Sequence, residues 1–257
     1  MGSILVCTAL ALWWLVRRRR SGHGLFAFFG LSVLYIYVRI WHRWSSSRPS
    51  LQLVKGPALL VANHTCSADP AFLTVGCWRP ISFLLARPYY KIPLLHWLCR
   101  YLRCIPVSRN GRDVAAVRSA LRCLEEERVV GIFPEGGLSN AGRLKLRGGK
   151  QGAAYLALKS RVPVFPALVV GGPQTSSIRR AWLGRSRVRI VLGAAIDLAA
   201  FYDRPITRPL LEEVTRLIFA RIDVLRSHRR PGHKSGAPGD GQTEDIHDCR
   251  KRIGTGS

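Results

Sequence analysis

The sequence predicts an α/β fold, in which helices flank a mixed or parallel β-sheet. From residue 51 onward, short apolar runs bounded by glycine, proline or charge alternate with longer runs whose apolar residues recur at helical spacing. This alternation is typical of a sheet with helices on its faces. The chain has 257 residues, of which 47% are hydrophobic, so it can bury the core of one large domain of this class or of two small ones.

The predicted elements follow one another without internal repeats. We predict strands over residues 58–63, 81–86, 104–108, 129–134, 163–170 and 188–192, and helices over residues 69–77, 89–102, 113–127, 150–160 and 208–226. Asp113 is predicted to cap its helix, because an aspartate side chain there accepts a hydrogen bond from the first turn. Pro163 and Pro166 indicate that their strand lies at a sheet edge or at the rim of a site, since proline cannot donate to a neighbouring strand.

Two apolar stretches precede this region. Residues 4–16 are followed by four arginines at 17–20, and residues 25–41 form a second stretch, which Arg39 interrupts near its end. As a helix, the first would be roughly 20 Å long, short of the ~30 Å hydrocarbon core of a bilayer. Both are rich in aromatic residues, which favour the lipid headgroup region. We predict a membrane-associated helical hairpin with its arginines on the cytoplasmic side.

Two other interpretations of these stretches are weaker. A secretory signal peptide carries its positive charge before the apolar run, whereas here the arginines follow it and no small-residue cleavage site comes next. Two buried core helices would leave the arginine run beside a dry core.

The predicted organisation has three parts. The membrane-associated hairpin occupies residues 1–44, and a single α/β domain occupies residues 45–227, beginning with a serine-rich linker at 45–50. Residues 228–257 are rich in glycine, proline and charge and are predicted to be a disordered tail.

The charge balance indicates anionic partners. The chain has 40 Lys and Arg against 15 Asp and Glu, a formal net charge of +25. Nucleic acid, anionic lipid and acidic carrier molecules would all be attracted, but the high apolar content favours lipid, and we expect no nucleic-acid partner. The seven cysteines form no CxxC pair, so we expect neither a zinc site nor a disulfide framework and predict a reducing compartment.

A histidine and an aspartate follow the first predicted strand of the domain. His64 comes directly after residues 58–63, and Asp69 stands five positions later, before Pro70. Because α/β proteins place their sites at the carboxyl ends of strands, a tight turn here can bring an imidazole to a carboxylate. Such a pair forms a general base. The alternative is that Asp69 only caps the next helix, and the His-x4-Asp spacing alone is a weak signal.

Glycines and basic residues follow another predicted strand. Residues 133–137 read Phe-Pro-Glu-Gly-Gly, and glycines allow the backbone to approach an anion closely. Arg109 follows the strand at 104–108, again where a ligand would bind. Further basic residues come after the glycines, namely Arg143, Lys145, Arg147 and Lys150. The alternative is an ordinary glycine turn with solvated charges.

Four stretches in this order, NHTCSAD, IPVSR, FPEGGLS and VPVFPAL, resemble the four sequence blocks of the glycerolipid acyltransferases. The resemblance is strongest to the bacterial 1-acyl-sn-glycerol-3-phosphate acyltransferases and covers roughly residues 51–192. The amino-terminal hairpin also resembles the membrane-docking helix pair of that family. The resemblance implies a membrane lipid as substrate and a location at the cytoplasmic face of a bacterial inner membrane.

The resemblance also implies a role for each site residue. His64 would deprotonate the free hydroxyl of a lysophospholipid, and Asp69 would orient the imidazole. Glu135, Gly136 and Gly137 would shape the acceptor site, and Arg109 would lie near the acceptor phosphate. The hydroxyl would attack the thioester of acyl-CoA or acyl carrier protein. With 1-acylglycerol-3-phosphate as acceptor the product is phosphatidic acid, and no metal or other cofactor is required.

One departure from the family's third block concerns the acceptor. The block usually continues Thr-Arg-Ser after Glu-Gly, but here Leu138 stands where the family has the arginine expected to hold phosphate. Either Arg109 compensates together with Arg143, Lys145 or Arg147, or the acceptor is another lysolipid or an amine-bearing lipid.

Two further alternatives remain open at this point. Cys66 lies between His64 and Asp69 and would carry the acyl group if its thiol pKa were lowered. A non-catalytic basic protein that binds a membrane surface or nucleic acid would explain the charge and the hairpin, although not the four blocks together.

Overall fold

The computed structural model describes residues 25–47, 56–77, 79–91, 96, 99–108, 113–137 and 151–227. These residues contain a seven-stranded sheet in the order β1-β7-β6-β2-β5-β3-β4. All neighbouring strands are parallel except β6 and β7, so the sheet is mixed and the predicted α/β class is confirmed. The strands are β1 Ser45–Ser46, β2 Ala58–Ala62, β3 Ile81–Ala86, β4 Ile105–Val107, β5 Val129–Ile132, β6 Val164–Val170 and β7 Arg189–Leu192.

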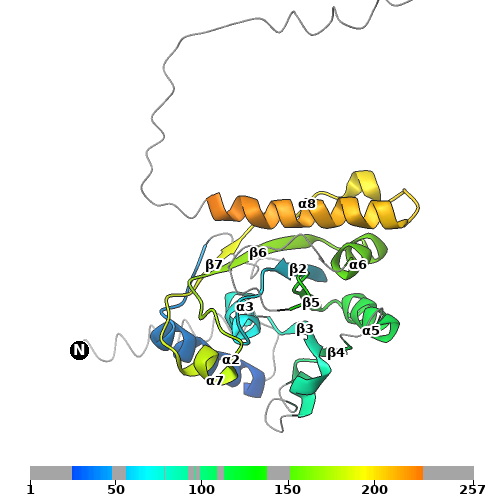
Figure 1. Cartoon of the computed structure of the whole chain (residues 1–257). Coiled ribbons are helices and arrows are strands. Elements are labelled where there is room, and N and C mark those ends of the chain that lie inside the picture. The colour runs from blue at the N-terminus through cyan, green and yellow to red at the C-terminus, as the bar shows by residue number, and fades with distance from the viewer. Residues whose placement is uncertain are drawn as a thin grey trace, which may run out of the picture.

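Helices cover both faces of this sheet (Figure 1). One face carries α5 (Val114–Glu125), α6 (Gly152–Ser160) and α8 (Arg208–Ser227), and the other carries α2 (Leu25–Trp41), α3 (Asp69–Cys77) and α7 (Ile178–Leu183). Two short 3-10 helices are η2 (Arg87–Lys91) and η3 (Ala199–Phe201). Each face therefore has its own apolar layer, as a doubly covered sheet requires.

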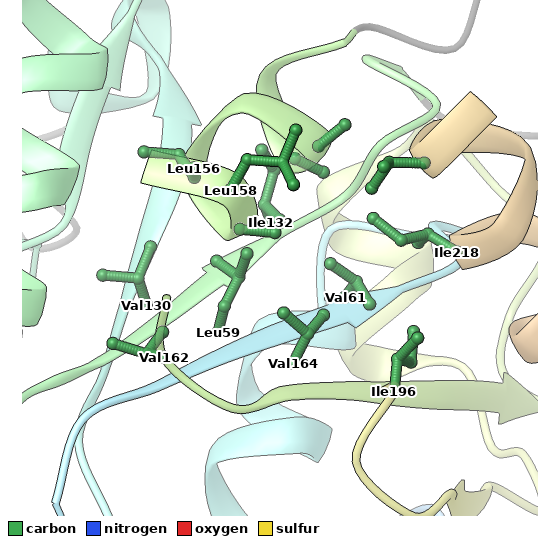
Figure 2. Packing of buried hydrophobic residues seen from close by; sticks show 14 of the residues in the cluster. Leu59, Val61, Val130, Ile132, Leu156, Leu158, Val162, Val164, Ile196 and Ile218 are labelled. Atoms are coloured by element: carbon green, nitrogen blue, oxygen red, sulfur yellow. The ribbon is translucent and has the colours of Figure 1, made fainter. Parts of the chain in front are cut away.

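The core on the α5/α6/α8 face is built from alternate residues of the central strands. Leu59 and Val61 of β2, Val130 of β5 and Val164 of β6 meet Leu156 of α6 (Figure 2). All five residues of β2 are buried, because this strand lies in the middle of the sheet between β5 and β6. A strand buried on both faces reads as a continuous apolar run, which is why residues 58–62 were recognisable in the sequence.

Pro166 does not mark a sheet edge, and the prediction of an edge strand is wrong. β6 pairs with β2 on one side and with β7 on the other. Alternate residues of β6 face β7, and the carbonyl of Pro166 accepts from the amide of Gly193 on that side at 2.9 Å. An N–H at position 166 would point toward β7, just beyond Ala167, the last β6 residue that pairs with that strand. Its absence in proline therefore costs no hydrogen bond to β2.

The serine-rich segment is not a linker at its start. Ser45 and Ser46 form β1 and pair in parallel with Arg189 and Ile190 of β7. The hydroxyl oxygen of Ser47 accepts from the amide of Leu192 at 3.0 Å. Polar composition predicted a turn here, whereas the free edge of β7 supplies backbone partners that the local sequence cannot show.

One predicted helix differs from the structure, and one helix of the structure was not predicted. The segment predicted as a helix over 89–102 begins with η2, and its described residues beyond that are helical at His96 and from Cys99 to Tyr101. α7 was not predicted at all, although Ser177 caps its start by accepting from the amide of Arg180. The predicted cap of α5 is confirmed, since Asp113 accepts from the amide of Ala116 at 3.0 Å.

The predicted second apolar helix is observed as α2, with the bounds expected from the sequence. Its 17 residues extend over about 25 Å at 1.5 Å per residue. Val38 of α2 and Trp44 after it are buried in the same core cluster as Phe72 of α3. No helix among the described residues is both long and apolar enough to cross a membrane. The first half of the predicted hairpin, residues 1–24, and the predicted tail, 228–257, lie outside the described residues.

Candidate active site

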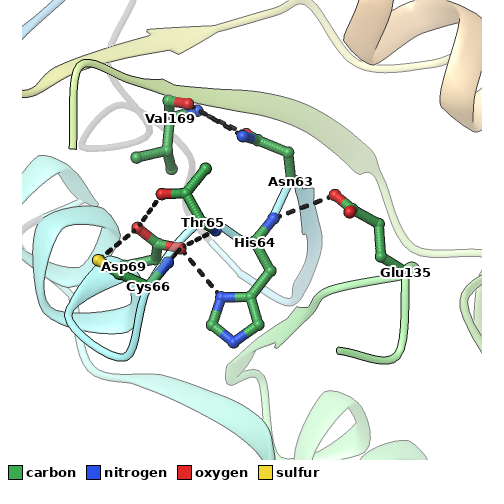
Figure 3. A network of polar contacts seen from close by, with 7 residues as sticks. All are labelled: Asn63, His64, Thr65, Cys66, Asp69, Glu135 and Val169. Atoms are coloured by element: carbon green, nitrogen blue, oxygen red, sulfur yellow. Dashed lines mark hydrogen bonds and ion pairs between the residues drawn. The ribbon is translucent and has the colours of Figure 1, made fainter. Parts of the chain in front are cut away.

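The site is built where β2 ends, at the carboxyl edge of the sheet. Asn63 follows the last residue of β2 and is almost fully buried. Its side-chain amide donates to the carbonyl of Val169 at 2.9 Å, and its Oδ1 accepts from the amide of Val169 at 2.7 Å. These two bonds fasten the end of β2 to β6 and fix the point from which His64 departs (Figure 3).

Asp69 gathers the turn that follows His64. Its carboxylate is fully buried, and Oδ2 accepts from the amides of Thr65 and Cys66, the second at 2.9 Å. Oδ1 accepts from the hydroxyl of Thr65 at 3.0 Å and from the thiol of Cys66 at 3.4 Å. A buried carboxylate needs such donors, because it has no water to solvate it. The turn therefore closes around Asp69 and cannot rearrange without exposing these groups.

Asp69 is not the helix cap that its position before Pro70 suggested. In the first turn of α3, the amide of Asp69 bonds to the carbonyl of Cys66, and the amides of Ala71 and Phe72 bond to the carbonyl of Ala68. The carboxylate of Asp69 points back into the turn. There it accepts hydrogen bonds from the amides of Thr65 and Cys66 and not from the amides of the helix.

The His64 imidazole is held in one orientation by contacts on its edge and on its face. Its Nδ1 lies 3.0 Å from Oδ2 of Asp69. Because a carboxylate oxygen only accepts, Nδ1 is the donor in this contact, so in the neutral imidazole Nε2 presents a lone pair. The ring of Phe133 stacks on the imidazole at 4.1 Å between centroids and 15°, and Phe83 stacks on Phe133 at 5.5 Å and 8°. The side chain of His64 is 19% exposed, so a small molecule can reach it.

Glu135 links the loop after β5 to the histidine turn. Its Oε1 accepts from the backbone amide of His64 at 3.1 Å (Figure 3). The loop is a tight turn in which the amide of Gly136 bonds to the carbonyl of Phe133, and Gly136 has φ of 68°, a backbone angle that favours glycine. The two stretches that looked separate in the sequence are therefore joined through Phe133 and Glu135.

A glycine on β5 makes the aromatic stack possible. A Cβ at Gly131 would lie 2.8 Å from Cγ2 of Ile81 and would also overlap the ring of Phe83. No side chain can occupy that position without moving the ring, so Gly131 leaves Phe83 free to lie flat against Phe133.

Cys66 is not set up as a nucleophile. Its side chain is buried, and burial raises the pKa of the thiol, with the negative charge of Asp69 as the next largest cause. A reactive cysteine needs the opposite arrangement, with positive charge and partial exposure that lower the pKa.

The segment after β6 borders the same turn. Thr175 forms an isolated parallel bridge with Cys66. A Cβ at Gly172 would come within 3.5 Å of the hydroxyl of Thr65. Residues 171–177 therefore pass beside the histidine turn before they lead into α7.

The structure brings together some of the predicted site residues and leaves others outside its described part. His64, Asp69, Glu135 and Gly136 form one site, and Gly137 follows with open space around its Cα. The remaining predicted residues lie outside the described residues, namely Arg109, Arg143, Lys145 and Arg147. Within the described part of the chain, no group of three or more His, Cys, Asp or Glu is arranged to hold a metal ion.

Sequence reasoning did not single out Asn63, Thr65 or Phe133. Each lies beside a recognised residue, so proximity in the sequence was a signal that could have found them. Their roles depend on contacts with Val169, Asp69 and His64 that form only in the folded chain.

Comparisons with known proteins identify the same region. A family model described as "Acyltransferase" matches residues 43–170. The chain is 27% identical over 114 residues to the 1-acyl-sn-glycerol-3-phosphate acyltransferase of Borreliella burgdorferi, covering 44% of this chain and 45% of that protein. It is 29% identical over 115 residues to the enzyme of the same name from Pseudomonas aeruginosa, covering 43% of each. The matched segment thus spans less than half the length of these two relatives.

Two further comparisons extend over more of the chain. The 1-acyl-sn-glycerol-3-phosphate acyltransferase of Bacillus subtilis is 21% identical over 170 residues, which cover 66% of this chain and 81% of that protein. The crystal structure of the 1-acyl-sn-glycerophosphate acyltransferase PlsC from Thermotoga maritima matches with a TM-score of 0.59 at 20% identity, covering 91% of this chain and all of that one. At this identity the structural match supports the fold alone.

Proposed function

Because the chain belongs to the glycerolipid acyltransferase family, we propose that it moves a fatty acyl group from acyl-CoA or acyl carrier protein to the free hydroxyl of a lysophospholipid. The observation that carries this proposal is the 3.0 Å contact between Nδ1 of His64 and Asp69, with the imidazole partly exposed. This is the geometry of a general base whose orientation a carboxylate fixes.

In the proposed reaction, Nε2 of His64 removes the proton from the acceptor hydroxyl. The hydroxyl oxygen attacks the carbonyl carbon of the thioester and forms a C–O bond. The C–S bond then breaks, and the imidazolium returns the proton to the departing thiolate. Asp69 stabilises the imidazolium through Nδ1, so no group on the protein needs to be acylated. The step as proposed uses no metal ion or redox cofactor.

The residues around the base act as its support. Phe133 holds the plane of the imidazole, Glu135 holds its backbone, and Asp69 holds its edge. Three contacts from two parts of the chain, the turn after β2 and the loop after β5, keep Nε2 in one place. A fixed position favours reaction because the base is already oriented for the hydroxyl.

The acceptor we propose is 1-acylglycerol-3-phosphate, which would give phosphatidic acid. The names of the relatives support this choice. Leu138 stands where the family has an arginine, so the acceptor phosphate would be held by Arg109 together with Arg143, Lys145 or Arg147, and Gly136 and Gly137 would let the backbone approach it. The same leucine is the reason to retain a second candidate, a different lysolipid or an amine-bearing lipid.

We propose that the enzyme acts at the cytoplasmic face of a membrane, where such lipids reside. The amino-terminal apolar stretches, of which α2 is the second, support this location. The division into a hairpin in residues 1–44, a domain in residues 45–227 and a tail remains part of the same proposal.

A panel of acceptors and donors on the purified full chain in detergent tests the function. We expect incorporation of radiolabelled acyl groups from acyl-CoA or acyl carrier protein into 1-acylglycerol-3-phosphate. Preferential incorporation into a different lysolipid or an amine-bearing lipid would instead support the second candidate. No incorporation with any pair of substrates would contradict the proposed reaction and favour a non-catalytic basic protein.

A further inference from the structure

Negative charge is unevenly distributed between the two faces of the molecule. The layer formed by α2, α3 and α7 contains one carboxylate, that of Asp69, and it is fully buried. No Asp or Glu occurs in residues 1–68 or 136–196. The opposite layer is mixed, because α8 alone carries Glu212, Glu213 and Asp223 beside its arginines.

Exposed arginines gather where the acids are missing. Six exposed arginines lie in the segment from α2 to β1 or between the end of β6 and the start of β7, namely Arg39, Arg43, Arg179, Arg180, Arg185 and Arg187. None of these takes part in an ion pair with another described residue, whereas Arg103, Arg161, Arg204 and Arg208 elsewhere in the described chain do. This surface is therefore positive and without internal compensation.

Large apolar side chains are exposed on the same two helices. On α2 they recur at intervals of four, three and four residues, which places Phe29, Val33, Ile36 and Ile40 along one side of the helix. Their exposed fractions lie between 51% and 65%. On α7, Leu183 is 64% exposed. A contiguous apolar strip of this kind marks an interaction surface, because isolated exposed apolar residues do not recur at helical spacing.

Direct contacts make α2 and α7 one surface (Figure 1). The indole of Trp41 donates to the carbonyl of Leu183 at 2.9 Å, and the hydroxyl of Tyr37 donates to the carbonyl of Trp182. The rings of Tyr37 and Trp182 stack at 6.2 Å, and the guanidinium of Arg185 lies over the ring of Trp41 at 5.0 Å. The two helices are therefore packed together, and their exposed residues belong to one structural unit. That unit continues through residues 171–177 to the histidine turn.

We propose that α7, with Arg179, Arg180 and the following Arg185, is a docking element for anionic lipid that acts together with the exposed strip of α2. We name this surface the α2/α7 face. A bilayer fits it because lipid phosphates would pair with the arginines while the headgroup boundary receives the apolar side chains. Nucleic acid would match the charge but would leave the apolar strip unused. The inference extends the proposed membrane location to a specific lipid charge and does not depend on the proposed chemistry.

The α2/α7 face is connected to the turn that holds His64. Since residues 171–177 connect α7 to the turn that holds His64, docking through α7 would hold the base at a fixed place relative to the lipid surface. A lysolipid could then reach His64 by lateral movement within the leaflet.

Vesicle sedimentation tests the proposal without any measurement of turnover. The full chain and the Arg179→Gln/Arg180→Gln variant are mixed with vesicles of phosphatidylcholine alone and with vesicles containing about one third phosphatidylglycerol. Each arginine near an anionic surface contributes roughly a fivefold increase in affinity, so we expect the double variant to bind the anionic vesicles roughly 25-fold more weakly than the wild type does. Binding of the wild type to the neutral vesicles should be weak.

The matched control is Arg216→Gln/Arg221→Gln on α8, which removes the same two charges from exposed positions on the opposite layer. We expect this variant to bind anionic vesicles within about twofold of the wild type. Salt screens the attraction between the vesicle and charges that lie far from the vesicle surface. Thermal unfolding of both variants checks that each is folded.

Three outcomes would overturn the proposal. The first is that the α7 variant binds anionic vesicles as the wild type does, or loses no more affinity than the α8 control. The second is that the wild type binds neutral and anionic vesicles equally. Alternatively, the α7 variant could keep its vesicle binding and lose affinity for acyl carrier protein, which would make the face a protein-docking surface.

Discussion

The orientation of one imidazole depends on residues that follow two neighbouring strands, β2 and β5. Asp69 fixes the edge of the His64 ring, Glu135 fixes its backbone amide, and Phe133 covers one of its faces. Phe133 in turn rests on Phe83 of β3. The imidazole of His64 is therefore supported by packing as much as by hydrogen bonds, and the packing contribution can be measured separately.

Replacing Phe133 by leucine should lower kcat while leaving KM for the acceptor nearly unchanged. A stacked ring pair contributes roughly 0.5–1.5 kcal/mol beyond its buried area, so we expect kcat to fall by about two- to tenfold. Phe133→Tyr, which keeps the ring, is the matched control and should retain near-normal kcat. A rise in KM with unchanged kcat in Phe133→Leu would show instead that this ring contacts substrate.

The thiol of Cys66 provides a second test at this scale, because it separates direct transfer from an acyl-cysteine route. Burial and the charge of Asp69 both raise the pKa of Cys66. Cys66→Ser keeps a donor to Asp69 and removes the thiol, so kcat should remain within about threefold of wild type. Loss of a true nucleophile would cost more than about 10³-fold. Such a loss, together with a thioester adduct detected by mass spectrometry, would replace the proposed mechanism.

Among the elements, α5 shows how a capping residue can also hold a loop. Asp113 accepts from the amide of Ala116 at its own helix and from the amide of Ser108, the residue that follows β4. These two donors, that of Ser108 first, lower the pKa of Asp113 below its ordinary value of 3.8. The carboxylate thus joins β4 to α5 at the start of the segment that contains Arg109.

The effect of Asp113 on stability should depend on pH. Asp113→Ala removes the cap and should lower the free energy of unfolding by about 1 kcal/mol at pH 7. Because the pKa of Asp113 is lower in the folded chain, the unfolded chain takes up the proton at higher pH. The contribution of the charged carboxylate to the free energy of unfolding is therefore complete well above pH 3.8 and is lost as the pH falls through the pKa of the folded state. Urea unfolding should therefore show a smaller difference between wild type and variant at pH 3 than at pH 7.

The matched variant for this prediction is Asp113→Asn, which keeps an acceptor for the amide of Ala116 without a titrating charge. Its stability at pH 7 should lie between those of the wild type and Asp113→Ala, because it keeps the cap but lacks the acid-dependent contribution of the charge. An equal loss in Asp113→Ala at pH 3 and pH 7 would show that the cap does not act through its charge.

How well each element could be predicted depends on whether its cause is local. β2 and α2 are long apolar runs, and α5 has both a helical apolar pattern and a capping aspartate, so their sequences were sufficient. β1 exists only because β7 offers it a free edge. Pro166 is tolerated in a central strand only because its missing donor falls at the end of a ladder. These causes lie in partners distant in the sequence.

The features of the candidate site also differ in whether their causes are local in the sequence. The spacing of His64 and Asp69 and the glycine turn after β5 are local, so the sequence could indicate them. That Glu135 accepts from the amide of His64, or that Phe133 stacks on the ring, requires β5 to lie beside β2. The pairing of these strands is a property of the whole sheet, and no local pattern encodes it.

The net charge of +25 should influence the whole molecule's capture of an anionic donor. Electrostatic steering raises association rates and is screened by salt. We expect kcat/KM for acyl-CoA to fall by about tenfold or more between about 50 and 500 mM NaCl, while kcat changes little. A short neutral acyl thioester is the control, and its kcat/KM should be nearly independent of salt. Equal salt dependence for both donors would contradict steering.

The most direct test of the central claim is the turnover of His64→Ala on 1-acylglycerol-3-phosphate and acyl-CoA, with His96→Ala as the control. His96 bonds to the carbonyl of Tyr90 and makes no contact with the His64 network in the described structure. We expect His64→Ala to lose about 10²–10⁴-fold in kcat while its thermal unfolding is unchanged, and we expect His96→Ala to stay within about threefold of wild type. Near-normal turnover in a folded His64→Ala protein would contradict the account.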